Sequence, residues 1–186
     1  GRPPGSTLFP DTTLFRSSAP GVLRQHGIAP SDRPIAMMRE YVALLRECLS
    51  GESVTFEGDF WQVRRFRLAL RLGDRSPKVV IAALNPQMLK LGGEVADAVL
   101  LNYIPASHVG EAARHIRSGG DATIMSYVHA AVGDLAAAAR SAQKDLFNYA
   151  TADGYANMFR AAGFGSDIDE LRSRQPERAR AGALPA

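Results

Sequence analysis

The sequence predicts a parallel α/β fold, and three observations lead to this fold class. Residues 78–102, KVVIAALNPQMLKLGGEVADAVLLN, have the pattern of a strand, a tight turn, a helix and a second strand. The first part of this stretch, residues 78–84, is almost wholly apolar and rich in β-branched side chains. Such a run is typical of a strand covered on both faces, as in parallel sheets. Helical and extended patterns also alternate along most of the chain, as they do in parallel α/β proteins.

The turn between the first strand and its helix lies at Asn85-Pro86. Asn is a favoured N-cap residue, and Pro fits the first helical position, where the N–H has no intrahelical partner. Gly92 and Gly93 lie within the helix. They either allow close packing of two backbones or simply weaken the helix.

The second strand is predicted at residues 98–101. Two parallel strands joined by this helix would form a right-handed βαβ unit. The carboxyl ends of the strands, at residues 83–85 and 101–103, would then meet at one edge of the sheet. Ligands bind at this edge in folds of this kind.

A helix and a β-hairpin are predicted before this central unit. The helix spans residues 34–49, with Ser31 or Asp32 as its cap and Gly51 as its stop. Its apolar face consists of Met38, Tyr41, Val42, Leu45 and Leu49. The following VTFEGDFWQV alternates around the turn signal EGD and predicts a hairpin. Trp61 is interpreted as a packing residue under this hairpin rather than as a platform for a cofactor.

The segments after the central unit continue the alternation. We expect a helix over residues 106–117 with Ser107 as its cap, and a third strand over residues 122–132. An alanine-rich helix follows from residue 134 to residue 162, with a break near 151–154, and Gly163-Phe164-Gly165 ends it. A last short helix is predicted over residues 167–174.

The composition is that of an ordinary globular protein. The 186 residues are 46% hydrophobic and 22% charged, with a net charge of +3. No basic stripe with interleaved aromatic residues is present, which disfavours nucleic-acid binding. The single cysteine, Cys48, excludes an intrachain disulfide, and its helical setting favours packing over catalysis. No apolar run is long enough for a membrane span, and no signal peptide is recognisable. A cytoplasmic location is therefore expected.

Residues 1–17 differ from the rest of the chain. Their TLFPDTTLFRS resembles TLFPYTTLFRS, one translated frame of a common short-read sequencing adapter, and departs from it only at Asp11. We therefore interpret residues 1–17 as a non-native segment. A disordered N-terminal tail is the alternative. Sequencing the source gene across this junction distinguishes the two, because genomic codons for the segment would refute the hypothesis.

Three stretches of the remaining chain together resemble the bacterial-luciferase-like monooxygenase superfamily. They are PIAMMREYVALLRECLSGESVTFEGDFWQV, KVVIAALNPQMLKLGGEVADAVLLN and NYATADGYANMFRAAGFG. The resemblance covers residues 18–171 and is greatest to members that use the deazaflavin coenzyme F420. The central stretch keeps the family pattern at Ile81-Ala82-Ala83, Pro86, Met88, Gly93, Ala96-Asp97 and Asn102. It departs from the pattern at Asn85 and Ala98, where the family usually has Gly.

The resemblance implies an incomplete TIM (β/α)8 barrel, made of second-half strands and helices with a β-hairpin insertion. Residue 18 would follow the fourth barrel strand, so the first half of the barrel would be absent. Residues 18–172 would form the partial barrel domain, and residues 173–186 a frayed tail. A polypeptide of this kind is expected to be inactive and poorly soluble, because an opened barrel leaves strand edges unpaired.

The resemblance also implies a site. The first turn of the helix after Asn85-Pro86 would line the cofactor through Leu84, Asn85, Gln87 and Met88. From the residues alone, this helix start could bind phosphate, although every helix has such a terminus. Asn at the usual Gly position can adopt left-handed dihedrals, but its side chain would crowd the approach of the cofactor to the backbone.

Asn102 and Tyr103, at the next strand end, are candidates for a substrate pocket. An equally weighted alternative is that Asn102 only satisfies a turn. None of the four histidines lies at metal-ligand spacing with another ligand, so no metal site is expected. No catalytic motif of the serine-hydrolase, P-loop or dinucleotide-binding type is present, and the catalytic residues stay unknown.

The function implied is that of an oxidoreductase. It would transfer hydride between coenzyme F420, or alternatively FMN, and an unknown small organic substrate. The intact protein would be a homo-oligomer without nucleic-acid or membrane partners. The alternative from another class is a non-catalytic α/β interaction module with an acidic partner.

Overall fold

The computed structural model describes residues 31–70, 77–128, 130, 132–150 and 152–173. The predictions for residues 1–17, for residues 174–186 and for His129 concern parts outside these ranges. All elements below belong to one compact unit that begins at Ser31.

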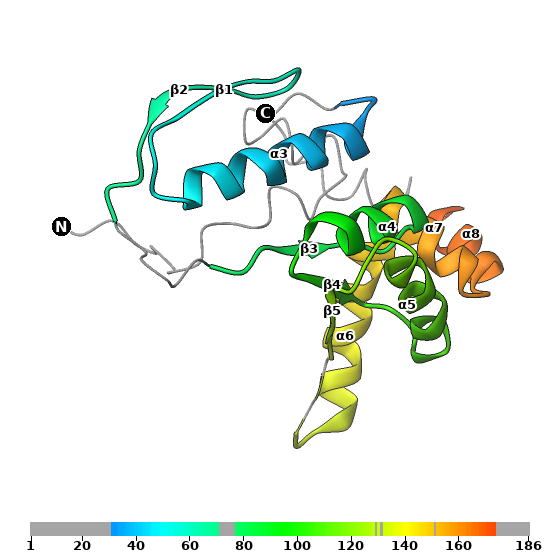
Figure 1. Cartoon of the computed structure of the whole chain (residues 1–186). Helices are drawn as coiled ribbons and strands as arrows, with labels where there is room; N and C mark the ends of the chain where they lie inside the picture. Colours follow the sequence, from blue (N-terminus) through cyan, green and yellow to red (C-terminus); the bar gives the residue numbers. More distant parts are fainter. Residues whose placement is uncertain (1–30, 71–76, 129, 131, 151, 174–186) are drawn as a thin grey trace, which may run out of the picture. The chain divides into compact units, whose positions relative to one another are not determined.

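This unit contains a parallel sheet of three strands (Figure 1). The strands are β3 (Val80–Ala82), β4 (Ala98–Asn102) and β5 (Thr123–Tyr127), in that spatial order. Both neighbouring pairs are parallel, with Val99 beside Ile81 and Ile124. The predicted α/β class with a parallel sheet is therefore confirmed.

Two strands are shorter than predicted, each for a local reason. The N–H of Val79 donates to the carboxylate of Asp97 at 2.7 Å, so the β3 ladder begins only at Val80. Strand β5 ends at Tyr127 instead of residue 132, because Tyr127 pairs with Asn102 and β4 offers no partner beyond it.

Helices α4 (Pro86–Val95) and α5 (Val109–Arg117) pack against each other, and α4 also packs against β3 and β4. Glycine makes this approach possible. A Cβ atom on Gly93 would overlap the carbonyl oxygen of Ile116, and one on Gly92 would lie 2.6 Å from a methyl group of Val99. Of the two alternatives for Gly92 and Gly93, the structure supports close packing over a weakened helix. The buried core of this region includes Ile81, Leu89, Leu91, Val99, Leu101 and Ile116.

The opposite face of the sheet carries exposed apolar side chains. Successive residues of a strand point to opposite faces. The strand residues that lie between the buried ones therefore point to the second face. They include Val80, Met125 and Tyr127, which are 42%, 46% and 59% exposed. This second face is therefore apolar and partly open.

Helix α3 (Pro34–Leu49) has the predicted bounds, but its cap and its buried face differ. Its N-cap residue is Arg33, without a side-chain cap bond, because the hydroxyl of Ser31 accepts from the N–H of Arg33 before the helix starts. Leu44 is buried and Leu45 is only half-buried, because α3 packs against both α4 and β1.

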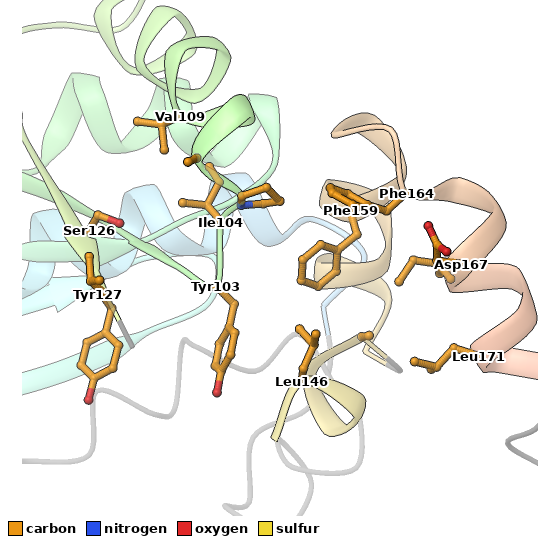
Figure 2. A pocket seen from close by; sticks show the side chains of 15 residues that line it. Tyr103, Ile104, Val109, Ser126, Tyr127, Leu146, Phe159, Phe164, Asp167 and Leu171 are labelled. Carbon is orange, nitrogen blue, oxygen red and sulfur yellow. The ribbon is translucent and has the colours of Figure 1, made fainter. Parts of the chain in front are cut away.

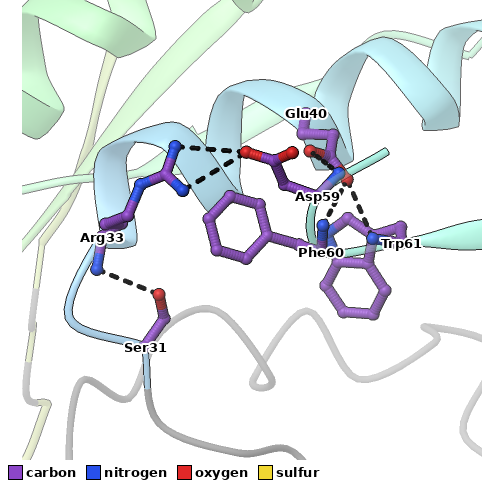
Figure 3. A network of polar contacts seen from close by, with 6 residues as sticks. All are labelled: Ser31, Arg33, Glu40, Asp59, Phe60 and Trp61. Carbon is purple, nitrogen blue, oxygen red and sulfur yellow. Dashed lines mark hydrogen bonds and ion pairs between the residues drawn. The ribbon is translucent and has the colours of Figure 1, made fainter. Parts of the chain in front are cut away.

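The predicted hairpin consists of β1 (Val54–Glu57) and β2 (Gln62–Phe66), which are antiparallel. Its turn is attached to α3 by Glu40 (Figure 3). The carboxylate accepts the backbone N–H groups of Asp59, Phe60 and Trp61 at 2.9, 2.9 and 2.8 Å. The Trp61 ring lies 5.4 Å from the ring of Tyr41, in agreement with a packing role.

Three further helices complete the unit: α6 (Leu135–Ala150), α7 (Asp153–Ala161) and α8 (Gly165–Ser173). They enclose a second apolar cluster, made of Ala150, Ala156, Met158, Phe159 and Ile168. The predicted break and stop are both present, and Gly163 has the left-handed φ of +96° that a helix end requires. Ser107 is not a cap, because it lies inside the 3-10 turn η1 (Ala106–His108) that precedes α5. None of the helices described is long and apolar enough to cross a membrane.

Candidate functional site

The carboxyl ends of β3 and β4 lie together and are both bound to the start of α7. Asn85, which follows β3, donates through Nδ2 to the carbonyl oxygen of Gly154 at 3.0 Å. Asn102, the last residue of β4, donates through Nδ2 to the hydroxyl of Tyr155 at 2.8 Å. Two adjacent residues of α7 thus hold two adjacent strand ends.

The start of α4 keeps backbone N–H groups available. Asn85 occupies the predicted N-cap position in an extended conformation, with φ −105° and ψ 150°, but its side chain makes no cap bond. Its amide is instead engaged with Gly154. The N–H of Leu89 donates to the carbonyl oxygen of Asn85 at 2.9 Å, so the N–H groups of Gln87 and Met88 precede this first intrahelical bond. These N–H groups and the helix dipole favour the binding of an anion at the helix start.

The side chains of the predicted cofactor residues point to different surroundings. Leu84 packs against the apolar cluster of α6, α7 and α8. Gln87 is exposed, and Met88 is half-buried. The structure therefore brings Asn85, Gln87 and Met88 to one helix start and directs Leu84 into the neighbouring core.

A cavity of about 660 Å³ opens beside this edge of the sheet. Residues at the ends of β4 and β5 form one wall, and side chains of α6, α7 and α8 form the facing wall (Figure 2). Its lining includes Tyr103, Ile104, Tyr127, Leu146, Phe159 and Phe164. The volume lies within the range of small-molecule sites.

Tyr103 is in the cavity lining, whereas Asn102 is not. Asn102 is only 4% exposed, and its amide holds Tyr155. Tyr103 has a φ of +52°, the left-handed region that residues other than Gly rarely adopt. Its ring lies 4.4 Å from the ring of Tyr149, which in turn lies 4.8 Å from that of Tyr155. Such strain persists only where the surroundings hold it, and it is concentrated at functional sites.

Sequence reasoning did not find the α7 and α8 contribution to this region. Gly154, Tyr155, Phe159 and Phe164 all lie in the stretch NYATADGYANMFRAAGFG, which supported the family resemblance without being given a role. Its aromatic residues at helical spacing were the available signal, but the same spacing also fits an ordinary helix core.

Asp97 has a role at the opposite end of the sheet. Its carboxylate accepts a hydrogen bond from the N–H of Val79 and forms an ion pair with Arg46 at 3.3 Å. The hydrogen bond from Val79, followed by the charge of Arg46, holds the pKa of Asp97 below its usual value despite partial burial. Burial, followed by the nearby charge of Glu47, raises the pKa of the Cys48 thiol. Across the described ranges no three metal-binding side chains form a cluster.

Comparison of the sequence with known proteins identifies relatives of this chain and its family. The chain is 38% identical over 77 residues to "5,10-methylenetetrahydromethanopterin reductase" of Methanolobus tindarius. That alignment covers 41% of this chain and 22% of the relative. The protein of the same name from Archaeoglobus fulgidus is 34% identical over 77 residues, with the same two shares. The matched part thus spans less than a quarter of each relative.

The sequence profile of one family covers far more of the chain. The profile described as luciferase-like monooxygenase matches residues 13–186. The resemblance noted from the sequence motifs is thereby confirmed, and the chain belongs to the luciferase-like monooxygenase family.

Proposed function

We propose that this protein is part of an oxidoreductase that uses coenzyme F420 and exchanges hydride with a small organic substrate. The observation that carries the proposal is the start of α4 at the carboxyl edge of the sheet. There the Asn85 side chain leaves the first-turn N–H groups uncapped. Family membership supports the oxidoreductase class, and the names of the two relatives, both reductases, support the direction of the chemistry.

The residues at this edge fit a phosphate-bearing cofactor. The backbone of Asn85, Gln87 and Met88 would hold the phosphate, since a helix start offers both N–H donors and a favourable dipole. The extended backbone of Asn85 and its bond to Gly154 keep its amide engaged elsewhere. When bound, the deazaflavin supplies the hydride chemistry, and the protein binds and orients it. FMN also carries a phosphate and is the alternative cofactor.

The apolar cavity beside Tyr103 is the proposed substrate pocket. It adjoins the same strand ends, and its lining is largely apolar. We further infer that the sheet belongs to a (β/α)8 barrel, in which the apolar face with Val80, Met125 and Tyr127 would face the interior.

Cofactor titration tests the proposal. The purified protein is titrated with F420 and, separately, with FMN, and binding is followed by cofactor fluorescence. The proposal expects saturable binding with tighter affinity for F420. Tighter binding of FMN would assign the flavin alternative, and absence of binding by either cofactor would refute a cofactor site in this chain.

A further inference from the structure

The cavity between the strand ends and helices α6–α8 has a composition that specifies its ligand. Among the described residues that line it, Asp167 is the only one with a charged side chain. Four aromatic rings border the space: Tyr103, Tyr127, Phe159 and Phe164. Figure 2 shows Tyr103 and Tyr127 on one side and Phe159 and Phe164 on the other. The polar side-chain groups of the lining are the hydroxyls of Tyr103, Ser126 and Tyr127 and the carboxylate of Asp167. The rest of the surface that a ligand meets consists of ring faces and aliphatic groups.

Several apolar side chains of the cavity are also exposed to solvent. Val128, Phe164 and Leu146 are 77%, 42% and 39% exposed, and Tyr127 is 59% exposed. Contiguous exposed apolar surface of this kind marks binding sites in soluble proteins. Covering it with an apolar ligand would remove this surface from water, which is favourable in proportion to the area covered.

The wall that carries Tyr103 is fixed in place. Tyr103 has left-handed backbone dihedrals and packs on Tyr149, which packs on Tyr155. The buried Asn102 amide holds the Tyr155 hydroxyl. A ring position that is held by this chain of contacts does not have to be ordered when a ligand binds, which lowers the cost of binding.

We propose that this cavity binds an uncharged, largely apolar ring compound, and that this compound represents the substrate class of the enzyme. The interpretation as substrate rests on the proposed function, whereas the binding preference rests on the cavity alone. Asp167, which is exposed in the first turn of α8, disfavours anionic ligands at the rim. A pterin ring carries several hydrogen-bonding groups that this lining would leave unpaired, and it should bind less well.

Binding of three probes to the purified 186-residue chain tests the proposal: 2-naphthol, naphthalene-2-sulfonate and a reduced pterin. Calorimetry should show the tightest binding for neutral 2-naphthol, by at least fivefold over each of the other two. Ala106→Phe adds bulk at an exposed lining position and should weaken 2-naphthol binding at least tenfold. Ala136→Phe, at an exposed position of α6 outside the lining, is the matched control and should leave it unchanged.

Charge selectivity gives a second readout. Asp167→Asn should leave the affinity for 2-naphthol within twofold and improve that for naphthalene-2-sulfonate several-fold. Equal weakening by Ala106→Phe and Ala136→Phe, or preferred binding of the sulfonate or the pterin by the unmodified chain, would overturn the proposal. Titration of F420 separates this outcome from the proposed function. If F420 binds and 2-naphthol does not, the proposed ligand class alone is refuted. If 2-naphthol binds and F420 does not, the cofactor site alone is refuted.

Discussion

Removal of the Asn102 side chain should loosen the attachment of α7 to the sheet. The side chain is 4% exposed, and its amide donates at 2.8 Å to the hydroxyl of Tyr155. One neutral hydrogen bond contributes about 1 kcal/mol, and truncation of a buried polar partner adds a desolvation cost of about 1 kcal/mol. Asn102→Ala should therefore lower the free energy of unfolding by about 2 kcal/mol. Urea denaturation followed by circular dichroism measures this change.

A double-mutant cycle isolates the contact from the general cost of truncation. Tyr155→Phe removes the hydroxyl and keeps the ring beside Tyr149. The two single changes and the double change should give a coupling free energy of about 1 kcal/mol. The same cycle with Tyr41→Phe, on α3, is the control and should be additive within about 0.5 kcal/mol. A coupling near zero between Asn102 and Tyr155 would refute the inferred link between β4 and α7.

Three further substitutions test the packing and the charges. Gly93→Ala should destabilise the protein by about 1–2 kcal/mol in thermal or urea denaturation, because its Cβ meets a carbonyl oxygen of α5; Gly110→Ala, whose Cβ meets nothing within 4 Å, should be neutral or stabilising. Glu40→Gln should lower the free energy of unfolding by about 1–2 kcal/mol, because it weakens three charge-assisted bonds to the hairpin turn. Glu47→Gln, on the exposed surface of the same helix, should change this free energy little. An equal loss in both variants would contradict the role assigned to Glu40. Asp97 has a lowered pKa in the folded protein, so its stabilisation is present above the unfolded pKa of about 3.9 and is lost as the pH falls through the folded pKa. Asp97→Asn should lower the free energy of unfolding at pH 7 and make the fall of that free energy below about pH 4 shallower. An unchanged dependence of stability on pH in this acid range would show that Asp97 does not contribute.

The parallel sheet was predictable because its determinants are local. The apolar run at residues 78–84, the Asn85-Pro86 turn and the helical spacing after it are each a short-range pattern. The bounds of α3 and the position of the hairpin followed from similar signals. The family was recognisable because several such segments occur together in one order.

The details that failed depend on contacts between distant segments. Asn85 has a residue type that favours capping, but its amide is taken by Gly154, 69 positions away. The burial of Leu44 in place of Leu45 depends on two elements that pack against α3. The cavity likewise needs α6, α7 and α8 folded back beside Tyr103, and no local pattern specifies that arrangement.

The most direct test of the central claim is the affinity for F420 compared with that for the same deazaflavin without its phosphate. The start of α4 should bind the phosphate, so the phosphorylated cofactor should bind at least tenfold more tightly. Gln87→Glu places a negative charge in the first helical turn, where it favours helix stability but repels an anion. The preference for the phosphorylated cofactor should largely disappear in Gln87→Glu and persist in the exposed control Gln143→Glu. An equal affinity for both cofactors in the unmodified protein, or an unchanged preference in Gln87→Glu, would contradict a phosphate site at this helix.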